Sequence, residues 1–381
     1  MQKFTRCTRC LLDTTIPGIK FDEEGVCNFC ALHDAMEEEY PQGEAGERAL
    51  QAIVKKVKKA GRNKEYDCVV GVSGGRDSTY VLYQTVKLGL RPLAVHFDNG
   101  WNSAVAATNI SSALNKLNVD LETIVADWSE FKDLQISFLK ASVCDAEVPT
   151  DVAILGSLHK IAAKHNIQYI MNGHSFRTEG VAPLTWTYMD GRYINKVQEQ
   201  FSGKKLRTIP NFTLWEMLYY TLIKRIKVIP LLNYVEYKHS VVNKVLEDEL
   251  GWTYYGGHHH ESHYTHFFHS FYLPQKFNID MRKLELSALI RSGQTTRAEA
   301  LQEVEKPYRF SEELVEYTCK KLGFTEKELN DLMAIPVKSF HDYPTYYPLI
   351  RKLKLPISAA AKLGVIPELL YYKFFPEVMV K

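Results

Sequence analysis

The sequence predicts an α/β protein with a parallel, doubly wound sheet, a short cysteine module before it and a mainly helical region after it. Three observations support this fold class. Apolar strand-like runs alternate with helical runs between residues 67 and 180, as in parallel sheets. Four of the seven cysteines lie in the first thirty residues. After residue 210 the pattern is largely helical and rich in aromatic side chains. We therefore expect a cysteine module at 1–36, an α/β domain at 50–210 and a helical region at 211–381.

The cysteine module has two Cys-x2-Cys pairs, with sixteen residues between them. This spacing is typical of a zinc ribbon, in which Cys7, Cys10, Cys27 and Cys30 hold Zn²⁺ tetrahedrally. Four thiolates leave no open coordination position, so such a metal is structural rather than catalytic. An iron–sulfur cluster uses the same kind of ligand and stays open as an alternative.

The alternating region provides the elements of the predicted sheet. We expect strands at 67–72, 92–97, 121–125 and 168–172, and helices at 77–88, 103–117, 130–140 and 150–165. The apolar stretch 212–235 is interrupted by charged residues and by Pro230. It therefore predicts a buried or surface-docked helix rather than a membrane span.

The stretch VVGVSGGRDSTYVL, residues 69–82, runs from a strand through two glycines into a helix. Such a turn exposes backbone N–H groups beside the positive end of a helix dipole, which favours an anion. Ser73 and Ser78 add hydroxyl donors, and Asp77 lies where a helix cap or a Mg²⁺ ligand is expected. The turn lacks the Gly-Lys-Ser/Thr of a Walker A loop and the Gly-x-Gly-x-x-Gly of dinucleotide folds.

Residues 73–78, Ser-Gly-Gly-Arg-Asp-Ser, resemble the PP-loop of the ATP pyrophosphatase superfamily, whose fold is adenine nucleotide alpha-hydrolase-like. The resemblance implies that ATP is cleaved between its α- and β-phosphates with Mg²⁺, while the loop holds the leaving pyrophosphate. It assigns Ser73 and Asp77 to catalysis. The implied nucleotide-binding residues of the loop are Val72, Ser73, Gly74, Gly75, Arg76, Asp77 and Ser78.

Two further strand ends fit a nucleotide site. AVHFDNGW, residues 94–101, ends its strand with Phe97, Asp98 and Asn99, which the resemblance assigns to adenine and ribose. QYIMNGHSFRTEG, residues 168–180, carries Gly173 and His174 where related proteins have a Gly-His near the nucleotide. Ligands of parallel α/β sheets bind at the carboxyl ends of the strands, so the three segments are expected to meet there.

Residues 251–307, together with the four cysteines, resemble the N-acetyl sugar amidotransferases of bacterial surface-glycan biosynthesis, such as that of the LPS O-antigen. The resemblance implies that ATP adenylylates the acetamido oxygen of a nucleotide-linked sugar. Ammonia then attacks the activated carbon, and AMP departs to leave an acetamidino group.

The same segments supply candidate substrate contacts. We expect Lys276 to act on the pyrophosphate with Lys283 behind it, although a solvated basic helix start explains such lysines equally well. The resemblance assigns His259, Glu261 and Ser262 to substrate or ATP. In TEGVAPLTWTY, Glu179 and Trp186 could contact the sugar, with a packed loop aromatic as the alternative. The histidine-rich run 258–269 places His259, His263 and His266 on one helical face, which leaves a second metal site as an open question.

The nitrogen source is expected to be a partner. None of Cys68, Cys144 and Cys319 lies in a nucleophile context, and residue 2 is Gln, so no glutaminase site is predicted in this chain. The resemblance implies separate glutaminase and ammonia-channelling, synthase-like subunits. The basic, aromatic stretch 343–381 could dock such a partner or pack on the core as a helix.

The balance of charged residues and the sequence of the N-terminus limit the remaining classes of function. The 47 basic residues nearly equal the 45 acidic ones, which argues against a nucleic-acid partner. The N-terminus has no apolar signal segment, so we expect a cytoplasmic protein. A PP-loop enzyme that modifies tRNA is the alternative function, and a nucleotide-binding scaffold without activity is a third hypothesis.

Overall fold

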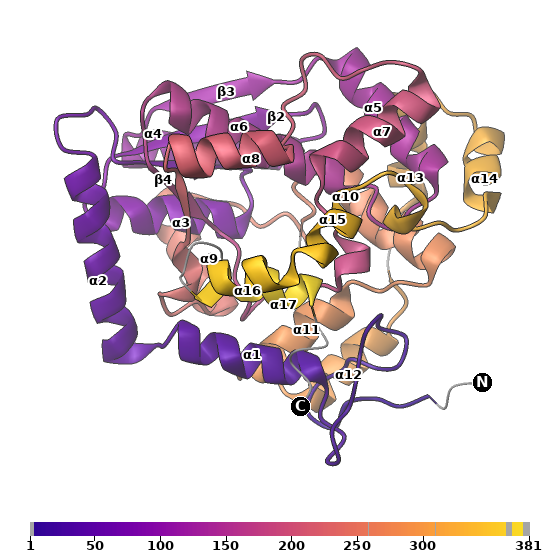
Figure 1. Cartoon of the computed structure of the whole chain (residues 1–381), viewed down its shortest axis with the longest axis horizontal. Helices are drawn as coiled ribbons and strands as arrows, with labels where there is room; N and C mark the ends of the chain where they lie inside the picture. The colour runs from indigo at the N-terminus through magenta and orange to yellow at the C-terminus, as the bar shows by residue number, and fades with distance from the viewer. Residues whose placement is uncertain (1–3, 258, 309, 363–367, 376–381) are drawn as a thin grey trace.

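The computed structural model describes residues 4–257, 259–308, 310–362 and 368–375. Its centre is a five-stranded sheet in the order β3-β2-β1-β4-β5, and every neighbouring pair is parallel (Figure 1). The strands are β1 Cys68–Gly71, β2 Pro92–Asp98, β3 Leu121–Val125, β4 Tyr169–Asn172 and β5 Lys227–Pro230. The predicted fold class and four predicted strands are confirmed.

The fifth strand corrects the helix expected over 212–235. That stretch contains α8, Leu214–Leu218, and the π-helix Tyr219–Ile223, but its second half is β5, which pairs with β4. The strand has four residues and lies at the edge of the sheet, so it carries too short an apolar run to stand out from a helix. The sheet therefore extends past residue 210, where the expected helical region begins.

The two faces of the sheet alternate as a buried parallel sheet requires. On one face Val69, Leu93 and Val95 pack with α6, Val148–Lys164. On the other face Val70 and Ala94 pack with three further helices. These helices are α2 Gly43–Ala60, α3 Arg76–Lys87 and α9 His239–Leu250. The first turns of α3 and α6 thus approach the carboxyl edge of the sheet.

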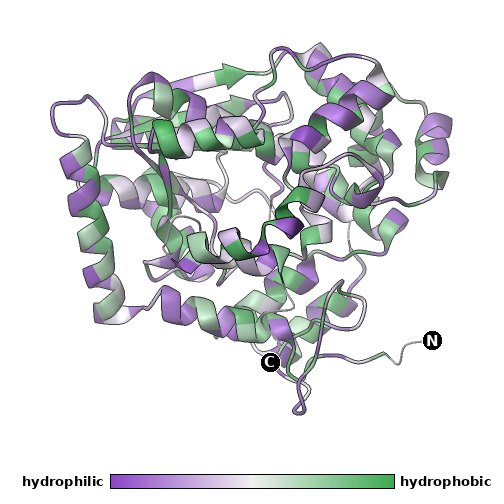
Figure 2. Cartoon of the chain, in the orientation of Figure 1, coloured by the Kyte–Doolittle hydropathy of each residue, from purple (hydrophilic) through white to green (hydrophobic). Residues whose placement is uncertain are grey.

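A second core lies beside the sheet and joins the cysteine module to the helical region. Figure 2 shows hydrophilic residues in purple and hydrophobic residues in green along the same helices, as expected for helices with one side facing a core. None of the helices within the described residues is long and apolar enough to cross a membrane. The remaining helices are α1 Asn28–Glu39, α4 Ala104–Leu117, α5 Trp128–Ala141, α7 Gly191–Ser202, α10 His263–Phe267, the π-helix Phe268–Phe277, α11 Arg282–Arg291, α12 Arg297–Glu305, α13 Glu312–Leu322, α14 Glu326–Ala334, α15 Tyr347–Lys352, α16 Lys354–Lys362 and α17 Glu368–Phe374.

Candidate nucleotide site and cysteine metal centre

The PP-loop connects β1 to α3, and its first glycine is required by both conformation and space. Gly74 has φ +80°, and a Cβ there would lie 2.2 Å from the carbonyl oxygen of Ala106. The Gly74 carbonyl accepts hydrogen bonds from Asn109 Nδ2 at 3.2 Å and Trp252 Nε1 at 3.0 Å. These contacts fix the loop against α4 and the segment after α9.

The backbone N–H groups of the loop donate hydrogen bonds to nearby hydroxyl groups. Ser73 N donates to Ser78 Oγ at 3.1 Å, and Gly75 N donates to Ser73 Oγ at 3.2 Å. Arg76 N donates to the hydroxyl of Tyr255 at 3.1 Å. These N–H groups lie at the start of α3, and a phosphate bound at this helix N-terminus would take the place of the hydroxyl groups as their acceptor.

Asp77 lies in the first turn of α3 and accepts hydrogen bonds at Oδ1. Its donors are the hydroxyl of Tyr237 and Nε of Arg76, the latter at 3.3 Å. Burial raises the pKa of Asp77 to about 6, although the charge of Arg76 acts in the opposite direction. A buried carboxylate of this kind is stabilised by a further cation, so the site suits Mg²⁺.

The Gly-His segment after β4 lies directly against the PP-loop. A Cβ on Gly173 would lie 3.3 Å from the Asp77 carbonyl carbon. His174 Nδ1 and Glu179 Oε2 are 2.7 Å apart, and Glu179 Oε1 accepts from Ser175 N at 3.2 Å. The Glu179 carboxylate raises the pKa of His174 against the effect of burial. The pair thus favours a charged imidazole beside the loop.

Residues 259–261 approach the loop from the opposite side. Glu261 is 9% exposed, and its Oε1 lies 3.4 Å from Ser73 Oγ. His259 has φ +60°, and its Nδ1 lies 3.7 Å from the same carboxylate oxygen. Burial lowers the pKa of His259, but the hydrogen bond and charge of Glu261 outweigh it and raise that pKa to about 10. This cation and carboxylate therefore face the PP-loop together.

Several of these side chains are partly exposed rather than packed in the core. The His174 side chain is 42% exposed and that of His259 is 37% exposed, and Asp151 on the first turn of α6 is exposed. The protein nevertheless desolvates Asp151 enough to raise its pKa to about 6. On α11, burial raises the pKa of Glu285 to about 7. The charges of these groups interact with one another and with the PP-loop residues at the carboxyl edge of the sheet, and we call this group of charged residues around the loop the hollow.

The residues expected at adenine and ribose have structural partners. Phe97 packs on Phe131 in the core, with ring centroids 5.8 Å apart. Asp98 Oδ1 accepts from Gly100 N at 2.9 Å, and Asn99 Oδ1 accepts from Trp101 N at 3.1 Å. Asp98 and Asn99 also line a pocket of about 320 Å³, whose other lining residues are Gly100, Val125, Ala126, Trp128 and Lys321. Their predicted role thus stays a prediction.

The lysines expected at the pyrophosphate are used elsewhere in the fold. Lys276 Nζ donates to the carbonyls of Leu332, Met333 and Ile335 at the end of α14, at 2.5–3.1 Å. Lys283 Nζ pairs with Asp13 Oδ2 at 2.8 Å, which ties α11 to the cysteine module. Both contacts join segments that are far apart in the sequence, so no local pattern around either lysine could reveal them.

Two expected substrate contacts also have packing roles. Trp186 is 7% exposed within the main core, which favours the packed aromatic over a sugar platform. Ser262 caps α10, because its Oγ accepts from Thr265 N at 3.3 Å.

The histidine-rich run forms no second metal cluster within the described residues, and His258 lies outside them. The ring of His263 lies 5.0 Å from that of Tyr317, and His266 stacks on His260 at 3.5 Å. His259 precedes α10 in a left-handed conformation, which takes it off the predicted helical face.

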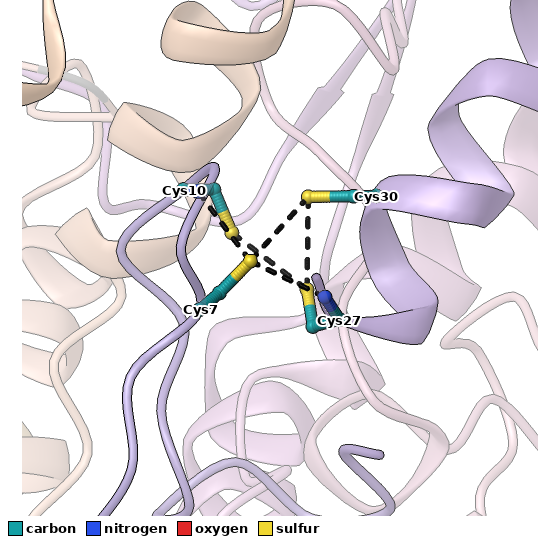
Figure 3. Close-up of side chains that lie close together, drawn as sticks. All are labelled: Cys7, Cys10, Cys27 and Cys30. Carbon is teal, nitrogen blue, oxygen red and sulfur yellow. Dashed lines mark hydrogen bonds between the residues drawn. The ribbon is translucent and has the colours of Figure 1, made fainter. Parts of the chain in front are cut away.

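The four module cysteines converge as predicted, with every pair of sulfurs within 4.8 Å (Figure 3). Cys7 and Cys10 come from one loop, while Cys27 and Cys30 lie at the start of α1. Three of these separations, Cys7–Cys30, Cys10–Cys27 and Cys27–Cys30, are 3.7–3.9 Å. Tetrahedral sulfurs at the usual zinc–sulfur bond of about 2.3 Å stand about 3.8 Å apart. The quartet therefore fits one metal ion, whereas a multi-iron cluster between the thiolates requires them to stand further apart.

Helix α11 holds the cysteine module with residues four positions apart. Besides Lys283, Ser287 Oγ accepts from Leu11 N at 3.2 Å, and Arg291 Nη1 lies 3.9 Å from the sulfurs of Cys10 and Cys30. The guanidinium offsets thiolate charge, as outer partners of metal ligands do. Because Glu285 of the same helix faces the hollow, α11 connects the two sites.

Sequence reasoning missed several groups around the hollow. The largest omissions are Tyr237, Tyr255, Glu285 and Asp151, which surround the PP-loop from four separate segments. Asp151 had a readable signal, because the first turn of a helix that leads into a parallel strand lies at the ligand-binding edge of the sheet. The other three lie in helical or aromatic stretches with no motif of their own.

Comparison with solved structures finds distant likenesses. One is an NH3-dependent NAD synthetase from Campylobacter jejuni, at 12% identity and TM-score 0.29, over 70% of this chain and 99% of that one. Another is the U34-tRNA thiolase NcsA from Methanococcus maripaludis, at 13% identity and TM-score 0.31, over 88% and 90%. At these scores neither likeness carries an argument about function. Comparison with the curated proteins gives no match.

The helical region gives a clearer relationship. Residues 261–354 match the family described as "LPS biosynthesis protein WbpG-like, C-terminal domain". The match begins at Glu261, which contacts the PP-loop, and it includes α11, which holds the cysteine module. The match agrees with the expected relationship: residues 261–354 of this chain are similar to the C-terminal domain of the WbpG-like LPS biosynthesis proteins.

Proposed function

We propose that this chain is an ATP-dependent amidotransferase that converts an acetamido group of a nucleotide-linked N-acetyl sugar to an acetamidino group. The reaction serves the biosynthesis of LPS O-antigen or a related surface glycan. One observation carries the proposal: Glu261, the first residue of the WbpG-like region, lies 3.4 Å from Ser73 of the PP-loop. The nucleotide loop and the LPS-related domain thus share one hollow.

The proposed chemistry has two steps. The acetamido oxygen attacks the α-phosphorus of ATP, so an oxygen–phosphorus bond forms and pyrophosphate leaves. Ammonia then attacks the activated carbon, loses a proton, and displaces AMP, which carries the former amide oxygen. Adenylylation supports this route because an amide oxygen is a poor leaving group and AMP is a good one. The hollow holds the reactants together and limits competing water.

The residues of the hollow fit these steps. The PP-loop donors, Ser73 among them, bind the leaving pyrophosphate at the start of α3. Asp77 and Glu261 are the carboxylates suited to hold Mg²⁺, which neutralises phosphate charge when bound. His174 has Nδ1 engaged by Glu179, so its Nε2 is the nitrogen that donates to a phosphate oxygen.

The cysteine quartet is proposed to bind Zn²⁺ as a structural ion. Its four ligands are at most 1% exposed, and their separations match a tetrahedral ion. The ion fixes the module against α11 and does not take part in the reaction. The resemblance further supports a cytoplasmic enzyme that receives ammonia from separate glutaminase and synthase-like subunits.

Product analysis tests the function directly. The purified chain is incubated with ATP, Mg²⁺, ammonium and a panel of nucleotide-linked di-N-acetyl sugars. Exchange of oxygen for NH lowers the sugar mass by about one unit, with AMP and pyrophosphate formed in equal amounts. Release of AMP and pyrophosphate without a changed sugar would retain the nucleotide site and reject the acceptor, and tRNA would then be tested.

A further inference from the structure

The C-terminal helix α17 packs across the Gly-His segment at the rim of the hollow. Tyr372 packs with Phe176, two residues after His174, and with Leu32 and Met36 of α1. On the other side, the ring centroid of Phe374 lies 6.3 Å from that of Tyr188. Figure 1 shows α16 and α17 in yellow across the middle of the molecule, beside α15.

This helix is anchored by α15 and α16. Arg351 Nη1 donates to the Phe374 carbonyl at 2.7 Å, and its guanidinium lies 5.0 Å from the ring centroid of Phe375. Lys354 Nζ lies 5.5 Å from the same ring. The contacts on both sides of residue 373 therefore fix where its side chain begins.

Lys373 lies between Tyr372 and Phe374 and is only partly exposed. Its electrostatic neighbours are Asp151 on α6 and His174 after β4, which both line the hollow. Burial lowers the pKa of the lysine, and the charge of Asp151 opposes this effect. The packing of its neighbours thus holds Lys373 beside the Gly-His segment, where its charge interacts with Asp151 and His174.

The charge balance of the hollow favours a further cation such as the Lys373 ammonium. The hollow has more carboxyl groups than basic groups if Lys373 is left out, and a bound nucleoside triphosphate adds several negative charges. The carboxyl groups are Asp77, Asp151, Glu179, Glu261 and Glu285, and the other basic groups are Arg76, His174 and His259. Lys276 and Lys283, the lysines expected for this task, are bound elsewhere.

We propose that α17 closes one side of the hollow and that Lys373 binds the phosphates of the nucleotide there. The inference rests on the proposed function for the identity of that nucleotide. It assigns to Lys373 the role that the sequence suggested for Lys276. On nucleotide binding, the ammonium turns from the Asp151 side to donate to phosphate oxygens, while Asp151 stays in the hollow.

The test compares two lysines of the C-terminal helices in the full-length chain. Lys373→Gln removes the proposed phosphate contact, and Lys362→Gln removes the same charge from an exposed position on α16. Calorimetry measures binding of a non-hydrolysable ATP analogue with Mg²⁺. We expect Lys373→Gln to weaken binding by about tenfold or more, Lys362→Gln to have no effect, and Lys373→Arg to restore most of the affinity.

The outcomes separate this inference from the proposed function. Equal affinity in Lys373→Gln and wild type would overturn the role of Lys373, whatever the acceptor is. Weaker binding with an unchanged melting temperature supports it, even if no sugar is modified in the product assay. Weaker binding that arginine fails to restore, with a lowered melting temperature, would assign Lys373 to packing and overturn the inference.

Discussion

The cysteine centre and the hollow differ in how their residues are assembled and exposed. All four cysteines come from one short segment, and each is at most 1% exposed. The hollow draws its groups from at least six segments and keeps the His174 side chain 42% exposed. A closed site binds one ion permanently, whereas an open site with opposing charges suits a substrate that enters and leaves. The comparison therefore supports the proposals of a structural role for the cysteine centre and of a reaction site at the hollow.

The largest effect is expected at the PP-loop. Asp77→Asn removes the carboxylate charge but keeps the side-chain shape, and we expect AMP formation to fall by about a hundredfold to a thousandfold. Asp248→Asn, at an exposed position of α9, is the control and keeps full activity. Undiminished turnover in Asp77→Asn would show that this aspartate is dispensable and would reject the reaction site.

Replacing Cys7 and Cys10 together by Ser tests the cysteine centre. We expect loss of about one metal ion per chain and a lower melting temperature, because a structural site contributes its binding energy to folding. Elemental analysis identifies the ion, and Cys319→Ser is a control that keeps it. Full metal content in the double variant would place the ligands elsewhere.

A comparison of Gly74 in the PP-loop with Gly43 at the start of α2 tests whether position 74 needs space or only conformational freedom. Gly74 and Gly43 have φ +80° and +67°, but only Gly74 has a backbone oxygen 2.2 Å from the position of an added Cβ, while Gly43 has nothing within 4 Å. Gly74→Ala is expected to destabilise the protein by about 3 kcal/mol, and Gly43→Ala by about 1 kcal/mol. Denaturant unfolding measures both values, and equal losses would contradict the predicted close approach to Ala106.

The smallest effect concerns pH and a carboxyl group next to the hollow. Burial raises the pKa of Glu147 to about 8, so the folded state holds a proton that the unfolded chain has lost above about pH 4.5. The free energy of unfolding therefore falls as pH rises towards 8, by about one kcal/mol per pH unit from this group. Glu147→Gln keeps an acceptor for Thr265, 2.9 Å away in the native protein, and is expected to flatten that slope. Parallel slopes between pH 6.5 and 8 would contradict the raised pKa.

How far each site could be predicted from the sequence depends on whether its residues come from one short segment or from distant segments. The cysteine spacing indicated all four ligands, because two short knuckles fold locally around an ion. The PP-loop, the Gly-His segment and Glu261 were also marked in the sequence, and the structure brings them together at one sheet edge. Lys276 and Lys283 could not be judged, because their partners, the end of α14 and Asp13, lie far away in the sequence.

The sequence by itself determined the parallel sheet, the glycine turn between β1 and α3 and the four-cysteine cluster, because apolar periodicity, glycine placement and cysteine spacing act over short stretches of chain. Only the tertiary structure decided that β5 completes the sheet, that α11 joins the cysteine centre to the hollow, and that Lys373 approaches Asp151. Those outcomes depend on which distant segments bury one another. Burial also sets the charges of the hollow, since desolvation and neighbouring groups exist only once the chain has folded.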